Sequence, residues 1–156
     1  MSLNTQIIGK TMPHGFAGTY ARQPDMIVNT RPVGGTENIP FGTALKYDSG
    51  KVVVMGGAGT VAAQFAGIAG SEVKSALVYP DQNGGKYAPG EACSVFQRGS
   101  INVLCQRGTP ALGGDVYVRI AKTADYATAL VGGFEAEADD KTAGNSVCLL
   151  YTSPSP

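Results

Sequence analysis

The chain has 156 residues, with 12 Lys or Arg, 12 Asp or Glu and one His, so its formal net charge at pH 7 is zero. Balanced charge and a charged fraction of only 15% exclude a strong general attraction to nucleic acid or to an anionic membrane surface. No apolar run approaches the ~20 residues that span a bilayer. The 22 glycines and nine prolines favour short elements joined by turns, so we expect one all-β domain without a nucleic-acid or membrane partner.

Residues 1–39 are rich in turn formers and lack a regular pattern, which predicts an extended N-terminal arm and not a separate core. The arm nevertheless carries Phe16, Tyr20, Met26 and Ile27. These side chains are too apolar for a solvated tail. We therefore expect them to contact a neighbouring subunit or another partner.

Residues 40–147 form the predicted β-domain. Two apolar runs, 43–47 and 51–55, flank Asp48-Ser49-Gly50 and predict a hairpin with glycine at a positive φ. Further strands are expected at 75–79, 93–96, 101–105 and 116–120. About eight short strands would suffice for a small closed barrel or a β-sandwich. The expected core residues are Val52, Val54, Val95, Ile101, Val103, Val116 and Val118.

The runs 93–96 and 101–105 flank Gly99 and suggest a second hairpin. Cys93 and Cys105 would face each other across it, although buried free thiols are the default interpretation. No C-x-x-C spacing is present, and His14 is the only histidine, so no zinc site and no other metal site is expected.

A dinucleotide-binding enzyme is an alternative interpretation. Gly57-Ala58-Gly59 follows an apolar strand and fits G-x-G-x-x-A, with Asp81 as the candidate ribose ligand. Gly67 and Gly70 interrupt the helix that this site needs, and glycine costs about 1 kcal/mol per helical position. We therefore favour a glycine-rich loop between strands, with no cofactor and no catalytic residues.

Acidic residues alternate near the C-terminus, where Glu135, Glu137 and Asp139 would share one face of a strand. Such a face offers oxygen ligands to a cation, but the spacing of a calcium loop is absent. A solvated edge is the favoured interpretation. Arg98 and Arg107 lie on either side of the predicted Cys105 hairpin and are expected to be solvated, or to bind a carboxylate on a partner.

The last nine residues, 148–156, resemble the translation of a transposase sequencing adapter, so we predict a non-native tail. In that case the native chain continued past Val147 and a closing strand is missing. A native tail rich in Ser and Pro is the alternative.

Four turn-and-strand segments occur in a fixed order, and none combines a nucleophile, a base and an orienting group. They are Pro40-Phe41-Gly42-Thr43-Ala44-Leu45, Phe65-Ala66-Gly67-Ile68-Ala69, Tyr87-Ala88-Pro89-Gly90-Glu91-Ala92-Cys93-Ser94-Val95 and Gly113-Gly114-Asp115-Val116-Tyr117-Val118. Their order, between about Gly15 and Ala143, resembles the structural cement or capsid decoration proteins of tailed bacteriophages.

This resemblance implies a non-enzymatic virion protein, made in the cytoplasm of the host bacterium and attached to the capsid exterior. The implied partner is the phage major capsid protein, and the resemblance also suggests a homo-oligomer. The apolar residues of the arm would then contact the capsid or a neighbouring subunit. A head-fibre or host-surface binding module is a further alternative.

Overall fold

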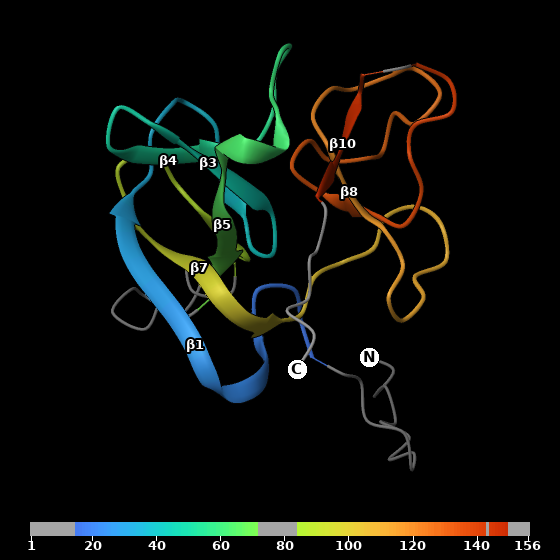
Figure 1. Cartoon of the computed structure of the whole chain (residues 1–156). Helices are drawn as coiled ribbons and strands as arrows, with labels where there is room; N and C mark the ends of the chain where they lie inside the picture. The colour runs from blue at the N-terminus through green and yellow to red at the C-terminus, as the bar shows by residue number, and fades with distance from the viewer. Residues whose placement is uncertain (1–14, 72–83, 143, 150–156) are drawn as a thin grey trace, which may run out of the picture.

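The computed structural model describes residues 15–71, 84–142 and 144–149 (Figure 1). These residues are almost entirely strands and turns, which confirms the all-β prediction. The described elements are β1 (Tyr20–Pro32), β2 (Ile39–Pro40), β3 (Ala44–Asp48), β4 (Lys51–Val54), the short 3-10 helix η1 (Ala62–Gln64), β5 (Phe65–Gly70), β6 (Lys86–Tyr87), β7 (Ala92–Ile101), β8 (Val116–Arg119), β9 (Phe134–Glu135) and β10 (Ser146–Leu149). In the part of the chain that the structure describes, no helix is long and apolar enough to cross a membrane.

The strands form three antiparallel sheets. The main sheet has the order β1-β7-β5-β3-β4, a second sheet has the order β10-β8-β9, and β2 pairs with β6. Figure 1 shows the C-terminal sheet beside the main one. The two edges of the main sheet approach each other at a single bridge between Val33 and Val52. The ladder does not continue among the described residues, so the predicted closed barrel and the number of eight strands are not confirmed.

The hairpin predicted between residues 43 and 55 is confirmed by the pairing of β3 with β4. Asp48 opposes Lys51, which leaves Ser49 and Gly50 as a two-residue loop instead of the expected three. Both loop residues have a positive φ, 49° for Ser49 and 82° for Gly50. This conformation matches a turn whose twist suits a tight hairpin, and glycine adopts it without a steric penalty.

The second predicted hairpin is wrong, because residues 92–101 form one continuous strand, β7. Gly99 has a φ of 115°, and a Cβ on it would lie 2.8 Å from the carbonyl oxygen of Asp25 in β1. Gly99 therefore lets β7 and β1 approach each other closely, and it does not form a turn. Cys93 is buried in β7, whereas Cys105 bridges Phe134, and both thiols are free. Burial raises the pKa of Cys93 to about 12, which leaves it protonated.

The main sheet is buried on both faces at the start of β3. Along β3, Ala44 belongs to one hydrophobic cluster and its neighbour Leu45 belongs to the other. Successive residues of a strand point to opposite faces, so β3 lies between two cores. Among the predicted core residues Val52, Val95 and Val118 are fully buried. The half-buried ones are Val54, Ile101 and Val116, and Val103 is 37% exposed.

The predicted arm and tail both contribute strand residues. Residues Tyr20–Pro32 form β1 and pair with β7, so the second half of the predicted arm is an edge strand of the main sheet. At the other end, Cys148 and Leu149 complete β10 and oppose Tyr117 and Val116. The predicted strand 75–79, Asp81 and His14 lie outside the described residues.

Candidate functional site

The four predicted contact residues divide into two groups. Phe16 is 79% exposed and Ile27 is 47% exposed, so both side chains are available to a partner. Tyr20 is half-buried and its ring packs at a tilt against Phe96 of β7, with ring centroids 5.2 Å apart. Met26 is also half-buried and lies beside Gly99. Phe16 and Ile27 therefore carry the exposed apolar surface of this region.

The Gly57-Ala58-Gly59 segment is a turn followed by η1, a single turn of three residues, and then by β5. The pyrophosphate site of a dinucleotide fold needs the N-terminus of a true helix, and this loop does not provide one. The Lys46 ammonium donates to the carbonyl oxygen of Gly56 at 2.6 Å and to Thr60 Oγ1 at 3.3 Å. Lys46 thus holds the loop between Gly56 and Thr60 in place by hydrogen bonds within the chain.

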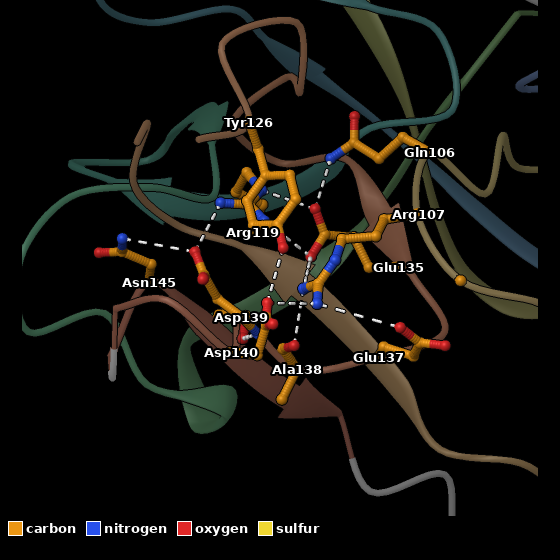
Figure 2. Close-up of polar contacts among 12 residues, drawn as sticks. Gln106, Arg107, Arg119, Tyr126, Glu135, Glu137, Ala138, Asp139, Asp140 and Asn145 are labelled. Atoms are coloured by element: carbon orange, nitrogen blue, oxygen red, sulfur yellow. Dashed lines mark hydrogen bonds and ion pairs between the residues drawn. The ribbon is translucent and has the colours of Figure 1, made fainter. Parts of the chain in front are cut away.

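The largest polar cluster of the described residues is centred on Arg119 at the end of β8 (Figure 2). Its guanidinium is fully buried and donates from Nε and Nη2 to the two carboxylate oxygens of Glu135 in β9, at 2.6 and 3.1 Å. Nη1 donates to Oδ2 of Asp139 at 2.9 Å. A forked guanidinium matches this geometry, in which one arginine joins two carboxylates.

Asp139 organises the loop before β10. Its Oδ1 accepts backbone N–H bonds from Lys141 and Thr142, at 2.9 and 3.2 Å. Its own backbone N–H donates to Ser146 Oγ, at 3.0 Å. The carboxylate therefore links the buried arginine to the chain that enters the last strand.

Arg107 and Tyr126 cover the cluster. The Arg107 guanidinium donates to the Ala138 carbonyl at 2.6 Å and to Asp140 at 2.8 Å, while Glu137 lies 3.9 Å away. The Tyr126 ring stacks on Arg107 and Arg119, whose guanidinium carbons are 4.5 and 5.1 Å from its centroid. The Tyr126 hydroxyl donates to Asp140 at 2.6 Å. Arg107 is thus bound within the chain, contrary to the expectation of a solvated turn arginine.

The charges in the cluster hold one another in their ionised forms. Burial alone raises the pKa of Asp139, but the bonds from Lys141, Thr142 and Arg119 outweigh it and lower this pKa to about 2. Burial alone lowers the pKa of Arg119, and its bonds to Glu135 and Asp139 raise it above the usual value. At neutral pH Arg119 and Asp139 are therefore both charged.

The expected solvated edge is wrong for Glu135 and Asp139, whose side chains are buried, while Glu137 stays 61% exposed. Each nitrogen of the Arg119 guanidinium donates to a carboxylate and the side chain is fully buried, so the cluster joins β8, β9 and a loop and does not present this arginine to an external anion. A signal was present in the sequence: an arginine inside the apolar run 116–120 needs a buried acid.

An apolar cavity of about 670 Å³ lies where the two larger sheets meet. Phe65 and Ile68 of β5, Phe96 of β7, Val116 of β8 and Leu149 of β10 are among its lining residues. Arg98, at its border, is bound to Asp25 at 3.0 Å. The cavity offers apolar contact and lacks convergent polar groups that would orient a substrate among the described residues.

Comparisons with known proteins identify the family. A family model described as "Structural cement protein (E217 gp24/Pam3 gp6)" matches residues 3–152, which is nearly the whole chain. No curated protein and no solved structure matches the chain. The match confirms the family resemblance noted in the sequence. The chain therefore belongs to the structural cement protein family of bacteriophages.

Proposed function

We propose that the protein binds the exterior of an assembled phage capsid, contacts the major capsid protein and stabilises the shell without catalysing a reaction. The observation that carries this proposal is membership of the cement family over residues 3–152. Synthesis in the host cytoplasm and assembly onto the virion belong to the same proposal. The exposed side chains of Phe16 and Ile27 supply a candidate contact surface.

The physical basis is linkage between binding and assembly. A protein that binds the shell and not its dissociated subunits lowers the free energy of the shell by RT ln(1 + [L]/Kd) at each site. The effect is repeated over many identical sites, so a modest affinity per copy becomes a large total stabilisation. Such a role needs a rigid body with apolar anchors, and the buried ionic cluster and two cores provide the rigid body.

The direct test adds purified protein to capsids assembled without it and, separately, to dissociated capsid protein. We expect co-sedimentation with the capsids alone, and a higher temperature of capsid disruption as the protein concentration rises. Binding to dissociated subunits with equal affinity would contradict the mechanism. Absence of capsid binding, with attachment to host cells instead, would favour a head-fibre or host-surface module.

Substitutions locate the contact. Deletion of the predicted arm would remove part of β1, so Phe16→Ser and Ile27→Ser are the cleaner variants. Each should weaken capsid binding by about ten-fold, as expected when an apolar anchor is lost. Leu112→Ser is the matched control, because Leu112 is fully exposed and lies in a different loop. If the control weakens binding while the two variants do not, the contact surface lies at that loop.

A further inference from the structure

We propose that the apolar cavity between the main sheet and the C-terminal sheet receives large apolar side chains of the major capsid protein and forms the centre of the contact with the shell. The inference rests on the proposed function, and it names the surface that carries this function and the chemistry of the partner segment. Ile27, which is paired with Arg98 at the border of the cavity, then lies at the edge of the contact.

The wall of the cavity is suited to apolar groups. Three phenylalanines and a leucine, Phe65, Phe96, Phe134 and Leu149, are among the residues that line it. Its volume of about 670 Å³ lies in the range of about 300–1,000 Å³ that holds ligands of drug size, so more than one large side chain fits. A polar group placed against such a wall would lose its water without gaining a hydrogen-bond partner. The wall therefore selects an apolar occupant.

The two longest polar side chains at the border already have partners within the chain. Arg98 is bound to Asp25 at 3.0 Å. Gln97 donates from Nε2 to the hydroxyl oxygen of Tyr47 at 2.7 Å, and its Oε1 accepts from Nδ2 of Asn29 at 2.5 Å. The positive charge at the border is thus balanced by a negative one, which does not favour a charged partner segment over an apolar one.

The cavity is open to solvent near η1 and near the segment that follows β7. Ala63 of η1 is exposed, Val103 is 37% exposed, and both residues line the cavity. Val61, just before η1, is also exposed. Apolar surface that is in contact with water in the free protein gains free energy when a partner covers it. A recess of this kind, with exposed apolar residues beside it, is typical of an interaction surface.

The exposed residue Phe16 lies beside this opening. Its C=O accepts the N–H of Thr19 at 3.0 Å, and Nδ2 of Asn102 donates to the C=O of Thr19 at 3.3 Å. Asn102 lies between Ile101 and Val103, and both of these line the cavity. The turn that carries Phe16 is therefore bonded to the segment that forms part of the wall. A capsid segment that contacts Phe16 is thus also next to the cavity.

The first test measures how fast N-ethylmaleimide labels thiols at the cavity, in the free protein and in protein bound to capsids assembled without it. Cys148 lines the cavity, and Val103→Cys supplies a second thiol at its opening. Leu112→Cys is the control, because Leu112 is fully exposed in a loop that does not line the cavity. We expect bound capsids to slow labelling at both cavity positions by about ten-fold or more, since a thiol must be accessible to react, and to leave the control unchanged.

The second test changes the chemistry of the opening. Val103→Asp places a carboxylate there, which keeps its water in the free protein and loses it under an apolar partner. Capsid binding should weaken by about ten-fold or more. Leu112→Asp makes the same change of charge outside the cavity and should have no effect, and Val103→Ile should bind like the unmodified protein. Thermal unfolding of each variant separates loss of binding from loss of fold.

The outcomes separate this inference from the proposed function. If the unmodified protein does not co-sediment with capsids, both fail. If it co-sediments while labelling of Cys148 and of the Val103→Cys variant stays unchanged, or if Val103→Asp binds with full affinity, the inference alone is overturned. Protection of Cys148 that needs only a higher protein concentration, without capsids, would assign the cavity to a second copy of the chain and would also overturn it.

Discussion

Arg119 shows how a single residue can hold a small β-domain together. It is fully buried, and its guanidinium joins β8 to β9 and to the loop that precedes β10. A buried ion pair contributes little net stability compared with apolar packing, but removal of one partner leaves the other uncompensated. The cluster therefore contributes more to the choice of one strand arrangement over others than to the free energy of unfolding.

Replacement of this residue should be costly. Arg119→Met keeps the length of the side chain and removes the charge, so the buried Glu135 loses both short bonds to Arg119 and keeps only Gln106 at 3.3 Å and Arg107 at 3.9 Å. We expect the free energy of unfolding to fall by about 3–5 kcal/mol. Urea unfolding followed by fluorescence or circular dichroism would measure it. Arg98→Met, which breaks an exposed pair, should cost less than about 1 kcal/mol; equal losses in the two variants would refute the distinction.

Asp139 should make stability depend on acid pH. Its pKa is about 2 in the folded protein and near 4 in the unfolded chain, so the unfolded state binds protons more readily. The stabilisation is complete above about pH 5 and is lost as the pH falls toward 2. Melting temperatures between pH 7 and pH 2 would show this decline. Asp139→Asn should be less stable at pH 7 and should decline less steeply; a variant with an unchanged slope would exclude Asp139 as the cause.

At the scale of elements, Gly67 determines how β5 fits between its neighbours. Its φ is 146°, and the pairing of β3 with β5 shifts register at this point, where Leu45 opposes Gly67 and Lys46 opposes Phe65. A Cβ on Gly67 would lie 2.6 Å from the carbonyl oxygen of Phe96 in β7. Glycine therefore permits β7 to approach the middle of the sheet.

Gly67→Ala should accordingly lower the free energy of unfolding by more than 2 kcal/mol, because backbone must move and a positive φ is strained. Gly113→Ala is the matched control, since Gly113 also has a positive φ, 73°, but has open space around its Cβ position. We expect a loss of about 1 kcal/mol there. Thermal unfolding of the two variants gives the comparison, and a larger loss at Gly113 would contradict the packing argument.

Local turns could be predicted from the sequence, whereas contacts between distant segments could not. The hairpin at Ser49-Gly50 could be predicted because these two loop residues themselves adopt the positive φ angles that the turn requires. Gly99 is also a glycine between two apolar runs, but it lies inside a strand. There it allows β7 to approach β1, which is seventy residues or more earlier in the chain. The cluster at Arg119 likewise depends on which acids the topology brings near. Sequence patterns without a fold cannot distinguish these cases.

At the scale of the whole molecule, the main sheet separates two cores, and the second core depends on the C-terminal sheet. Ala44, Met55, Val118 and Phe134 form its buried centre, and Leu149 at the end of β10 packs against it. Both clusters share β3, so unfolding of one exposes residues adjacent to the other. This arrangement favours a single cooperative transition.

Leu149→Ala should test the coupling. Truncation of a half-buried leucine at the second core should cost about 1–3 kcal/mol, while Leu112→Ala at an exposed site should change stability by less than about 0.5 kcal/mol. Hydrogen exchange would show whether β3 loses protection together with β8. Faster exchange confined to the C-terminal sheet would contradict a single cooperative unit.

The pairing of β1 with β7 affects how the molecule would respond to a pulling force. β1 is paired with β7 from Tyr20, opposite Ile101, to Pro32, opposite Ala92, with register shifts before Val28 and an unbroken register from Val28 to Pro32. A force along the strand axis would shear many backbone hydrogen bonds at once, whereas a force across it would peel them one at a time. β1 would therefore resist being pulled along its own axis more strongly than being peeled from the edge of the sheet.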